Sequence, residues 1–424
     1  MTELVALLFL QLALILATCR FVTYVGKRYL GQTDVVCEMI AGIILGPTVL
    51  GLLLPSIQHW IFPLTPVLLA NGREMANASM TLIYSISQLG LIMYMFLVGL
   101  EFDSTIVKER YKTVSAIVIA GVLTPFILGG VLSWMLFIKG GLFTPSVNLT
   151  TAILFFGICV SMTAFPMLAR ILYDKNLAKT NYGVLALASG SVGDVIGWCL
   201  LAIMLATIKH DVYSAWVTII GGMLYIIFML TWGKKILSVF FARYENKKNA
   251  APLLAVALIL ILLSAWITDK IGIHAIFGAF IAGVAMPRGA LLQRIQTKLE
   301  TVTIAFLLPV FFVYSGLNTQ IELINTLELW IIAGIIIIIA ICGKLFACTL
   351  AAKGCGENWR DAFTIGTLMN ARGLMELIIL HIGLQYHLIT PTLFSVMIVM
   401  TLVTTFMTSP LLHALVKTNL TIKR

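Results

Sequence analysis

Long apolar stretches alternate with short polar segments along the whole chain. Most of these stretches reach the roughly 20 residues that an α-helix needs to cross a bilayer, and two are shorter. The pattern therefore predicts an all-α polytopic membrane protein with about 13 transmembrane helices. The thirteen stretches lie near residues 4–24, 34–54, 81–100, 112–138, 150–169, 182–208, 213–233, 250–268, 272–286, 302–317, 329–352, 361–383 and 391–416.

Composition supports this class of protein. Of the 424 residues, 60% are hydrophobic and 11% are charged, whereas about one-quarter of a soluble domain is charged. The first residues lack a basic segment and the first apolar stretch is long enough to span, so we expect a first helix rather than a cleavable signal peptide. The seven cysteines form no Cys-x-x-Cys motif and have no histidine nearby in sequence, so packing is their expected role.

The basic residues are distributed unevenly, and their distribution indicates the topology. With the N-terminus outside, 21 of the 28 lysines and arginines fall in predicted cytoplasmic loops and the tail, 4 in outer loops and 3 within spans. This asymmetry follows the positive-inside rule. We therefore attribute the net charge of +10 to topology and not to nucleic acid, and expect a cell (inner) membrane protein with a cytoplasmic C-terminus.

The two halves of the chain resemble each other weakly. The segments "EMIAGIILGPTVLG" (38–51) and "GAFIAGVAMPRG" (278–289) share an Ala-Gly pair and an exit proline, and "FLVGLEFD" (96–103) pairs with "FFVYSGLNTQ" (311–320). The offset of seven helices makes paired helices run in opposite directions. This predicts two inverted six-helix repeats, typical of secondary transporters, with chance similarity among apolar helices as the alternative.

The predicted organisation is a single membrane transporter domain over residues 1–424. Repeat 1 covers about 4–208, a connector helix about 213–241, and repeat 2 about 250–416. The longest non-apolar segments are too short for a soluble regulatory domain, so we expect any regulator to be a separate subunit.

Four charged side chains fall clearly within predicted spans: Asp194, Lys344, Arg372 and Glu376. A charge at mid-bilayer costs at least ~2.5 kcal/mol, so each needs a partner or a function. Asp194 lies near the middle of the sixth helix, and Lys344 is its candidate ion-pair partner because both lie near the same depth. The simpler alternatives are a protonated Asp194 bonded to the backbone, and a Lys344 that is a structural counter-charge or extends toward the interface.

The fifth helix contains a proline at membrane depth, in "CVSMTAFPMLAR" (159–170). Pro166 removes a backbone donor and disfavours helical geometry at Phe165. Ser161 and Thr163 lie beside this break, where their hydroxyls and freed carbonyls can coordinate a cation. A simple proline kink is the alternative.

The twelfth helix concentrates polar residues, among them Asn370, in "LMNARGLMELIIL" (368–380). Arg372 and Glu376 are four residues apart, so one interpretation is an internal pair without further role. The other is a helix interrupted near Gly373, whose charges compensate the ends of two half-helices. Two interrupted helices at equivalent positions of inverted halves indicate a transporter's ion site.

Other ionisable residues lie nearer the membrane surfaces. We expect His274 to be an interfacial packing residue. Glu101 and Asp103 would form a solvated end of the third helix. Glu38, one turn into the second helix, would face a dimer interface or water.

Eight sequence blocks, taken in order, resemble the monovalent cation:proton antiporter family, in the branch with plant cation/H+ exchangers and bacterial K+-efflux antiporters. Together they cover nearly the whole chain. The blocks are "EMIAGIILGPTVLG", "FLVGLEFD", "SMTAFPMLARIL", "GVLALASGSVGDVIGW", "IGIHAIFGAFIAGVAMP", "PVFFVYSGL", "CGKLFA" and "NARGLMELIIL".

This resemblance implies a core domain with two crossed, interrupted helices, here helices 5 and 12, beside a second domain that makes a homodimer. It also implies that Asp194 carries the cation and the proton alternately, with Lys344 as its partner and Thr163 and nearby carbonyls as ligands. Many relatives have a polar residue before the aspartate, whereas this chain has Gly193. Ion selectivity and stoichiometry therefore stay open.

The sequence thus predicts a secondary active antiporter that exchanges Na+ or K+ for protons by competition at Asp194. A sodium-coupled solute symporter on a similar fold is the nearest alternative. An intramembrane aspartyl protease, which "SVGD" suggests, lacks a second aspartate at depth, and an ion channel lacks a recognisable filter. We expect no enzymatic activity, no cofactor and no metal beyond the transported cation.

Overall fold

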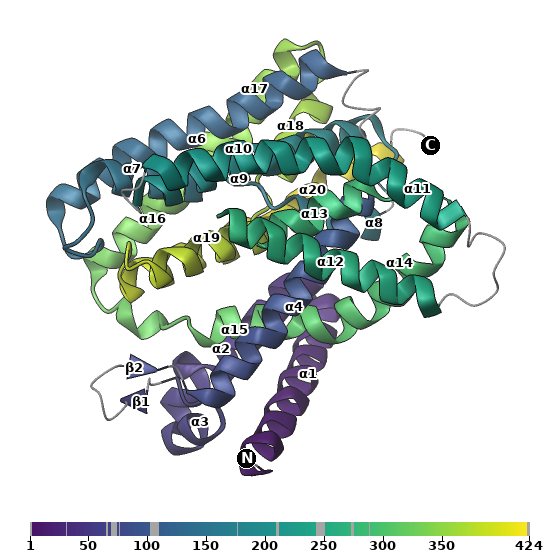
Figure 1. Ribbon diagram of the computed structural model, residues 1–424. Coiled ribbons are helices and arrows are strands. Elements are labelled where there is room, and N and C mark those ends of the chain that lie inside the picture. The colour runs from purple at the N-terminus through teal and green to yellow at the C-terminus, as the bar shows by residue number, and fades with distance from the viewer. Residues whose placement is uncertain are drawn as a thin grey trace. The chain divides into compact units, whose positions relative to one another are not determined.

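The computed structural model of the chain is almost entirely helical (Figure 1). Within the described residues, the two named strands are β1 (Val67–Leu68) and β2 (Glu74–Met75), which pair antiparallel. The predicted all-α class is confirmed. The structure describes residues 2–30, 32–64, 67–68, 74–75, 77–101, 110–175, 177–208, 212–242, 251–272, 275–287 and 289–421.

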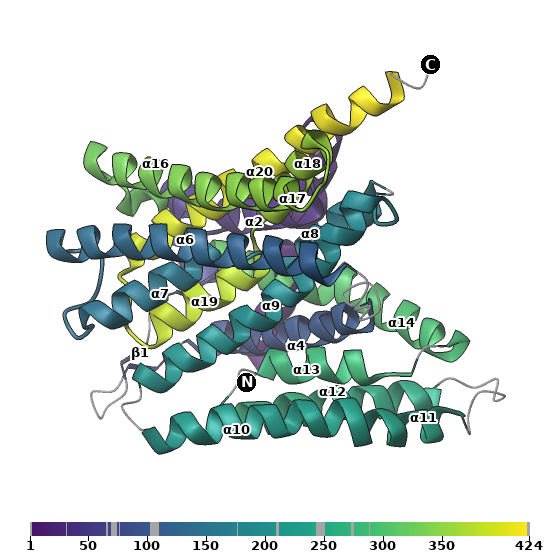
Figure 2. The ribbon, with the colours of Figure 1, turned by 90° about the horizontal axis from the view of Figure 1, so that it is seen from above.

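Contacts between helices divide the chain into two compact units, the first of which comprises Met1–Ala17, His59–Phe102 and Leu205–Tyr314. In this unit α10 packs against α12, and the two run side by side in Figure 2. Its elements are α4 (Ala78–Glu101), α10 (Val212–Phe228), η2 (Met229–Gly233), α11 (Lys234–Ala242), α12 (Ala251–Ile271), α13 (Ala275–Ala285), α14 (Ala290–Val302) and η3 (Thr303–Leu307), where η2 and η3 are π-helical turns.

The second unit comprises Thr18–Gln58, Asp103–Met204 and Ser315–Arg424. Its elements are α2 (Asp34–Leu45), the π-helical turn η1 (Pro47–Gly51), α6 (Tyr111–Lys139), α7 (Leu149–Ser161), α8 (Phe165–Asp174), the 3-10 turn η4 (Ile321–Leu323), α16 (Leu327–Ile341), the π-helical turn η5 (Cys342–Phe346), α17 (Ala347–Gly354), α18 (Trp359–Met369), α19 (Leu374–Gln385) and α20 (Pro391–Thr421).

Four helices pass from one unit into the other along the chain: α1 (Thr2–Leu30), α3 (Pro55–Ile61), α9 (Asn181–Ile208) and α15 (Leu308–Leu317). Each unit contains helices from both predicted repeats. The division by contacts is therefore different from the division into repeats, whose boundaries stay a prediction.

The helices have the length and composition of membrane spans. In the described part of the chain, ten are long and apolar enough to cross a membrane, and three shorter apolar helices are Leu149–Ser161, Ala275–Ala285 and Met375–Gln385. Each of the thirteen predicted stretches overlaps one of these segments, and the stretches 150–169 and 361–383 are each divided between two helices. Because the three short helices fall below the length that spans alone, the number of crossings stays a prediction.

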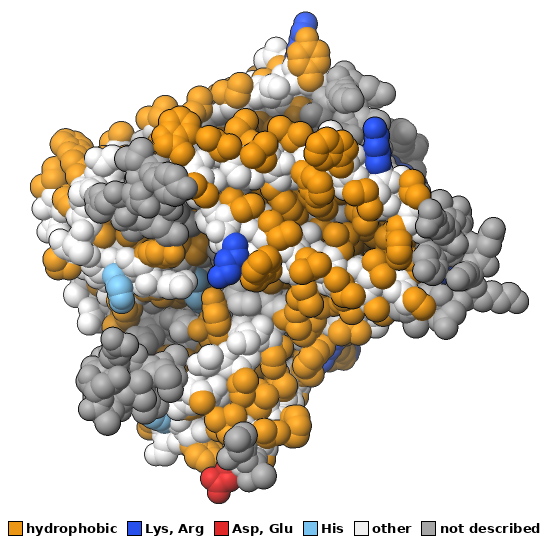
Figure 3. Space-filling model, in the orientation of Figure 1, with side chains coloured by type: hydrophobic (Ala, Val, Ile, Leu, Met, Phe, Trp, Pro, Cys, Tyr) orange, Lys and Arg blue, Asp and Glu red, His pale blue; other side chains and the backbone are white. Residues whose placement is uncertain are grey.

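Large hydrophobic side chains lie exposed on the outer helices, where a soluble protein would place charges. On α10 and α12 they include Trp216 at 59% exposed, Met223 at 59% and Trp266 at 59%. Figure 3 shows hydrophobic side chains over most of the described surface on one face. This surface is suited to lipid and not to water.

In the first unit, α4 and α13 pack with their backbones in contact. A Cβ atom added at Gly99 would lie 2.2 Å from the Phe280 carbonyl oxygen, and one at Gly283 would lie 2.2 Å from the Phe96 carbonyl oxygen. Small residues at such crossings let membrane helices approach closely without a hydrophobic driving force. Each of the two helices therefore has a glycine at the point where the other helix comes closest.

In the second unit, a buried glutamate joins the ends of several helices. Glu357 lies in the turn between α17 and α18 and is 8% exposed. Its carboxylate accepts a hydrogen bond from Arg110, just before α6, at 2.5 Å and one from Asn181, the first residue of α9, at 2.8 Å. Lys353 donates to the Glu357 backbone carbonyl. These bonds fix the start of α9, the helix that carries Asp194.

The glycine contact between α4 and α13 predicts a position-specific effect of a single methyl group. We expect Gly99→Ala to destabilise the protein by about 1–3 kcal/mol because the added carbon forces the two helix backbones apart. Gly334→Ala in α16 is the matched control, since a Cβ there has nothing within 4 Å, and it should leave stability unchanged or raise it slightly. The melting temperatures of the two variants, purified in detergent, measure these changes in stability. Equal melting temperatures for Gly99→Ala and Gly334→Ala would contradict the packing described.

Candidate functional site

The fifth predicted helix is interrupted in the structure, not merely kinked. It ends as α7 at Ser161 and resumes as α8 at Phe165. Met162, which follows α7, is extended, with φ −68° and ψ 141°. Thr163 lies between the two half-helices and is 5% exposed. The prediction of an interruption beside Thr163 is confirmed.

The twelfth predicted helix is also interrupted. It ends as α18 at Met369 and resumes as α19 at Leu374. Gly373 has φ +144°, a conformation that a residue with a side chain rarely adopts. The glycine thus permits the non-helical backbone from which α19 starts, and an uninterrupted helix over this segment is ruled out.

The two interruptions meet. The backbone N–H of Ala164 donates a hydrogen bond to the Ala371 carbonyl at 3.1 Å, and both residues are at most 1% exposed. The bond joins segments more than 200 residues apart in sequence and satisfies backbone groups that neither half-helix can satisfy alone. Helices 5 and 12 therefore cross at their non-helical segments, which we call the crossing (residues 162–164 and 370–373).

Two buried cations cap the end of α7 at this crossing. The Arg372 guanidinium donates to the Cys159 carbonyl at 3.2 Å and to the Val160 carbonyl at 2.6 Å. The Lys344 ammonium donates to the Ser161 carbonyl. The last carbonyls of a helix have no intrahelical partner and carry the negative end of the helix dipole. Both cations are 0% exposed, and these carbonyls compensate part of the cost of burying them.

A carboxylate lies at the start of the opposite half-helix. Glu376 is in the first turn of α19, where the positive end of the helix dipole favours an anion. Its carboxylate also pairs with Arg372 at 3.6 Å, with both side chains buried. Thr405 of α20 holds the same segment by donating to the Arg372 carbonyl at 2.9 Å. The predicted compensation of half-helix ends by Arg372 and Glu376 therefore agrees with the geometry.

Lys344 is located in an irregular turn. It is the middle residue of η5, a π-helical turn between α16 and α17. Single π-turns inside α-helices recur at functional sites because they displace a side chain from the regular helical position. A Cβ added to the adjacent Gly343 would lie 3.0 Å from the Cα of Pro125, so η5 packs directly against α6.

Asp194 is buried in the middle of α9 and is 2% exposed. No hydrogen bond of ordinary length and angle reaches either carboxylate oxygen from a described residue. The Phe165 N–H, at the start of α8, acts on the carboxylate as a weak donor, and the Lys344 ammonium also favours its charge. No ion pair joins Asp194 and Lys344 among the described residues, since Lys344 bonds to Ser161 instead. Their role as ion-pair partners stays a prediction.

The structure thus brings the six predicted site residues to one region of the second unit. The Ser161 hydroxyl donates to the Ile158 carbonyl at 2.9 Å within α7, so its oxygen remains available as an acceptor. Among the described residues, no group of three or more histidine, cysteine, aspartate or glutamate side chains could hold a metal ion.

Two polar residues of this region were missed as site residues. Asn370, the C-cap of α18, is 0% exposed, and was noted only as part of a polar segment. His381 of α19 is likewise not among the predicted site residues; its Nδ1 lies 2.9 Å from the Leu377 carbonyl oxygen and its ring packs edge-on against Phe394. The available signal was their position on the interrupted helix within an apolar span.

The predictions for the ionisable residues nearer the membrane surfaces compare differently with the structure. Glu38 is 5% exposed, so the part of the prediction that placed it facing water is wrong; it is buried in α2. Glu101 ends α4 and is exposed, as expected for a solvated helix end. Asp103 and His274 lie outside the described residues.

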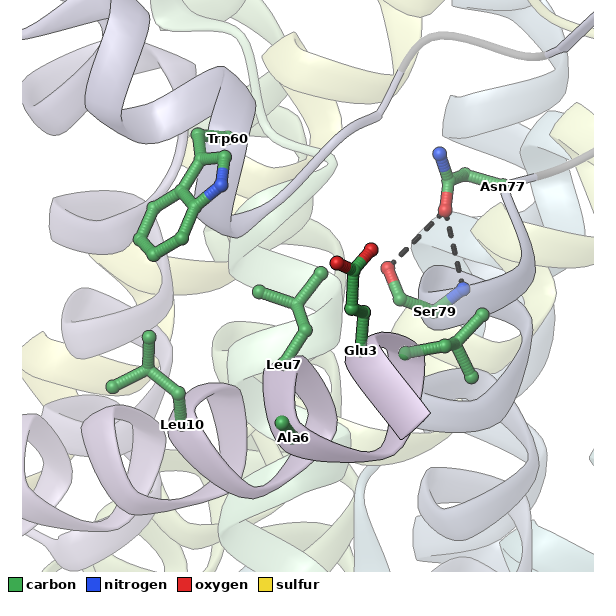
Figure 4. A pocket seen from close by; sticks show the side chains of 8 residues that line it. Glu3, Ala6, Leu7, Leu10, Trp60, Asn77 and Ser79 are labelled. Atoms are coloured by element: carbon green, nitrogen blue, oxygen red, sulfur yellow. Dashed lines mark hydrogen bonds between the residues drawn. The ribbon is translucent and has the colours of Figure 1, made fainter. Parts of the chain in front are cut away.

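A cavity of about 560 Å³ lies in the first unit, away from these residues in sequence. Figure 4 shows Glu3, Leu7 and Leu10 of α1 on one side of it and Trp60 on another. Asn77 accepts hydrogen bonds from the backbone N–H and hydroxyl of Ser79 at its rim. None of the six predicted site residues lines this cavity.

Known proteins resemble the chain over nearly its full length. The sequence profile of a family described as "Sodium/hydrogen exchanger, transmembrane" matches residues 13–418. Na(+)/H(+) antiporter NhaS4 of Synechocystis sp. is 38% identical over 97% of this chain and 97% of that protein. Cation/H(+) antiporter 19 of Arabidopsis thaliana is 34% identical over 97% of this chain, which spans 50% of that relative.

A solved structure shares the fold. The sodium proton antiporter MjNhaP1 from Methanocaldococcus jannaschii aligns with a TM-score of 0.64 and 17% sequence identity, over 97% of each chain. At this identity the likeness concerns the arrangement of helices alone.

The capping of α7 predicts a coupled effect of the charges that meet there. We expect Arg372→Met to cost about 3–5 kcal/mol, because it leaves the Glu376 charge buried without its partner. Adding Glu376→Gln removes that charge, so the double variant should lose less stability than the sum of the two single variants. Melting temperatures of the four proteins in detergent test this. Additive losses would show that the pair does not act as a unit.

Proposed function

This chain belongs to the sodium/hydrogen exchanger family, and on that premise we propose that it is a secondary active antiporter that exchanges a monovalent cation, Na+ or K+, for protons. The carboxylate of Asp194 is the exchanging group. The observation that carries this proposal is its environment: it is 2% exposed, it lies beside the crossing, and the Phe165 N–H acts on it only as a weak donor, outside ordinary hydrogen-bond geometry. A buried carboxylate whose charge is so weakly compensated needs either a proton or a cation.

Competition between the two occupants follows from charge. Among the buried side chains that the structure describes in this region, the carboxylates are Asp194 and Glu376 and the cations are Lys344 and Arg372. With all four ionised their formal charges sum to zero. A proton on Asp194 or a monovalent cation beside it adds one positive charge in either case. The two occupants are therefore electrostatically equivalent, and one replaces the other without a change in the net charge of the site.

The ligands around a cation would be oxygen atoms from the first interruption. Thr163 lies in the non-helical segment, and Ser161 is the last residue of α7. In this proposal they assist Asp194 in replacing the hydration shell of the ion. Lys344 stabilises the ionised, empty Asp194 and returns to the Ser161 carbonyl when the cation arrives.

The wider setting is part of the same proposal. The chain works as a transporter and not as an enzyme, as a homodimer in the cell (inner) membrane, with its N-terminus outside and its C-terminus cytoplasmic. The excess of basic residues in alternate loops supports this orientation. A regulatory subunit, where one acts, is a separate chain.

Replacing the exchanging carboxyl group tests the site directly. Asp194→Asn keeps the size of the side chain but removes its titratable charge, so cation-driven proton flux in proteoliposomes should fall to the level of empty vesicles. A pH-sensitive dye follows the flux on addition of Na+, K+ or Li+. Glu322→Gln, at an exposed carboxylate of η4, is the control and should keep the wild-type rate.

Retained exchange in Asp194→Asn would refute the assignment of the carboxylate. A wild-type flux that needs an organic solute and produces no cation-driven pH change would identify a symporter instead.

The charge balance at the crossing predicts electroneutral exchange. If one proton leaves for each cation that enters, the rate of dye response should be the same at zero and at an imposed membrane potential. Vesicles clamped with a K+ ionophore and measured with a Na+ gradient make the comparison. A rate that rises with the potential would mean that a second group, such as Lys344, also releases a proton.

A further inference from the structure

Beside the crossing lies a buried side chain with none of its polar atoms in a hydrogen bond or ion pair with a described residue. It is Asn370, which is 0% exposed. Neither the carbonyl oxygen nor the amide nitrogen of the Asn370 side chain finds a partner there. Its backbone N–H is already satisfied by the Gly366 carbonyl at 3.1 Å. The side chain is therefore not needed to end α18.

Asn370 lies next to the contact that joins the two interruptions. The following residue, Ala371, accepts the hydrogen bond from the Ala164 N–H. Ala164 is flanked by Thr163, a proposed ligand, and by Phe165, whose N–H acts on the charge of Asp194. Through these neighbours Asn370 belongs to the region where the cation is expected to bind.

An amide without partners destabilises a buried position, and an apolar residue of similar size would remove that cost. A group of this kind is explained if its partner is present only in another state of the protein. The side-chain carbonyl of asparagine is an oxygen ligand suited to hard cations. The geometry points to Asn370 as a further ligand of the exchanged cation, alongside Asp194 and Thr163; this inference rests on the proposed antiport function.

The helix that carries Asp194 contributes no side chain at the position before the carboxylate, which is Gly193, and a Cβ added there has nothing within 4 Å. In this inference Asn370, from the second interruption, supplies an oxygen atom that α9 does not supply at position 193.

The test compares Asn370→Ala with a matched control, Ser133→Ala in α6, whose hydroxyl is also buried and without a described partner but lies outside both interruptions. In buffer free of Na+ and K+, Asn370→Ala should melt at the same temperature as the wild type or higher, because an unpaired amide is removed. The rise in melting temperature on adding Na+ or K+ should be lost, and the cation KM for proton flux should increase about tenfold or more. Ser133→Ala should keep both the rise and the KM.

Asn370→Asp provides a second variant, because it keeps an oxygen atom at the same position. We expect it to retain stabilisation by the cation. The inference is overturned if Asn370→Ala keeps the wild-type cation KM, if it melts lower in cation-free buffer, as loss of a structural hydrogen bond would cause, or if Ser133→Ala has the same effect. A wild-type protein that is stabilised by cations but gives no cation-driven flux would overturn the antiport proposal and leave the binding measurement on Asn370 valid.

Discussion

The end of α7 inside the apolar interior is the constraint on which the second unit depends. A helix that stops at Ser161 leaves carbonyl groups where no water or lipid can satisfy them. Arg372 and Lys344 satisfy three consecutive carbonyls, at residues 159, 160 and 161. Neither cation could be buried at tolerable cost without these acceptors and the nearby carboxylates. The broken helix and the buried charges therefore stabilise each other, and neither is explained alone.

Different interactions stabilise the interior of each of the two units. In the first unit the glycines of α4 and α13 allow backbone contact, and the packing is apolar. In the second unit, hydrogen bonds of charged side chains link segments far apart in sequence, as at Glu357 and Arg372. Apolar packing tolerates few changes of volume, whereas charged contacts can exchange partners. The titratable groups of the proposed mechanism all belong to the second unit.

The sequence identifies the residues whose placement in a membrane has a large energetic cost, and it misses the groups whose cost is small. Asp194, Lys344, Arg372 and Glu376 stand out because a charge in an apolar span needs a reason, and Pro166 and Gly373 locate both interruptions. The partner of Lys344 was predicted as a carboxylate, yet in the structure it is the carbonyl of a residue 183 positions away, and a backbone acceptor leaves no trace in a sequence. Asn370 does not stand out in the same way, because its amide carries no charge and so does not call for a counter-charge in the span.

Lys344 has a choice of partners that follows from its position. Its ammonium donates to the Ser161 carbonyl, while Asp194 acts on the same charge without an ion pair. The carbonyl offers a partial charge that never changes, whereas the carboxylate offers a full charge that disappears on protonation and is offset by a bound cation. In the proposed mechanism the preferred partner of Lys344 therefore depends on the occupancy of Asp194. Because the Ser161 carbonyl ends α7, a change of partner at Lys344 alters the capping of a half-helix and so couples the charge of one side chain to the backbone of the crossing.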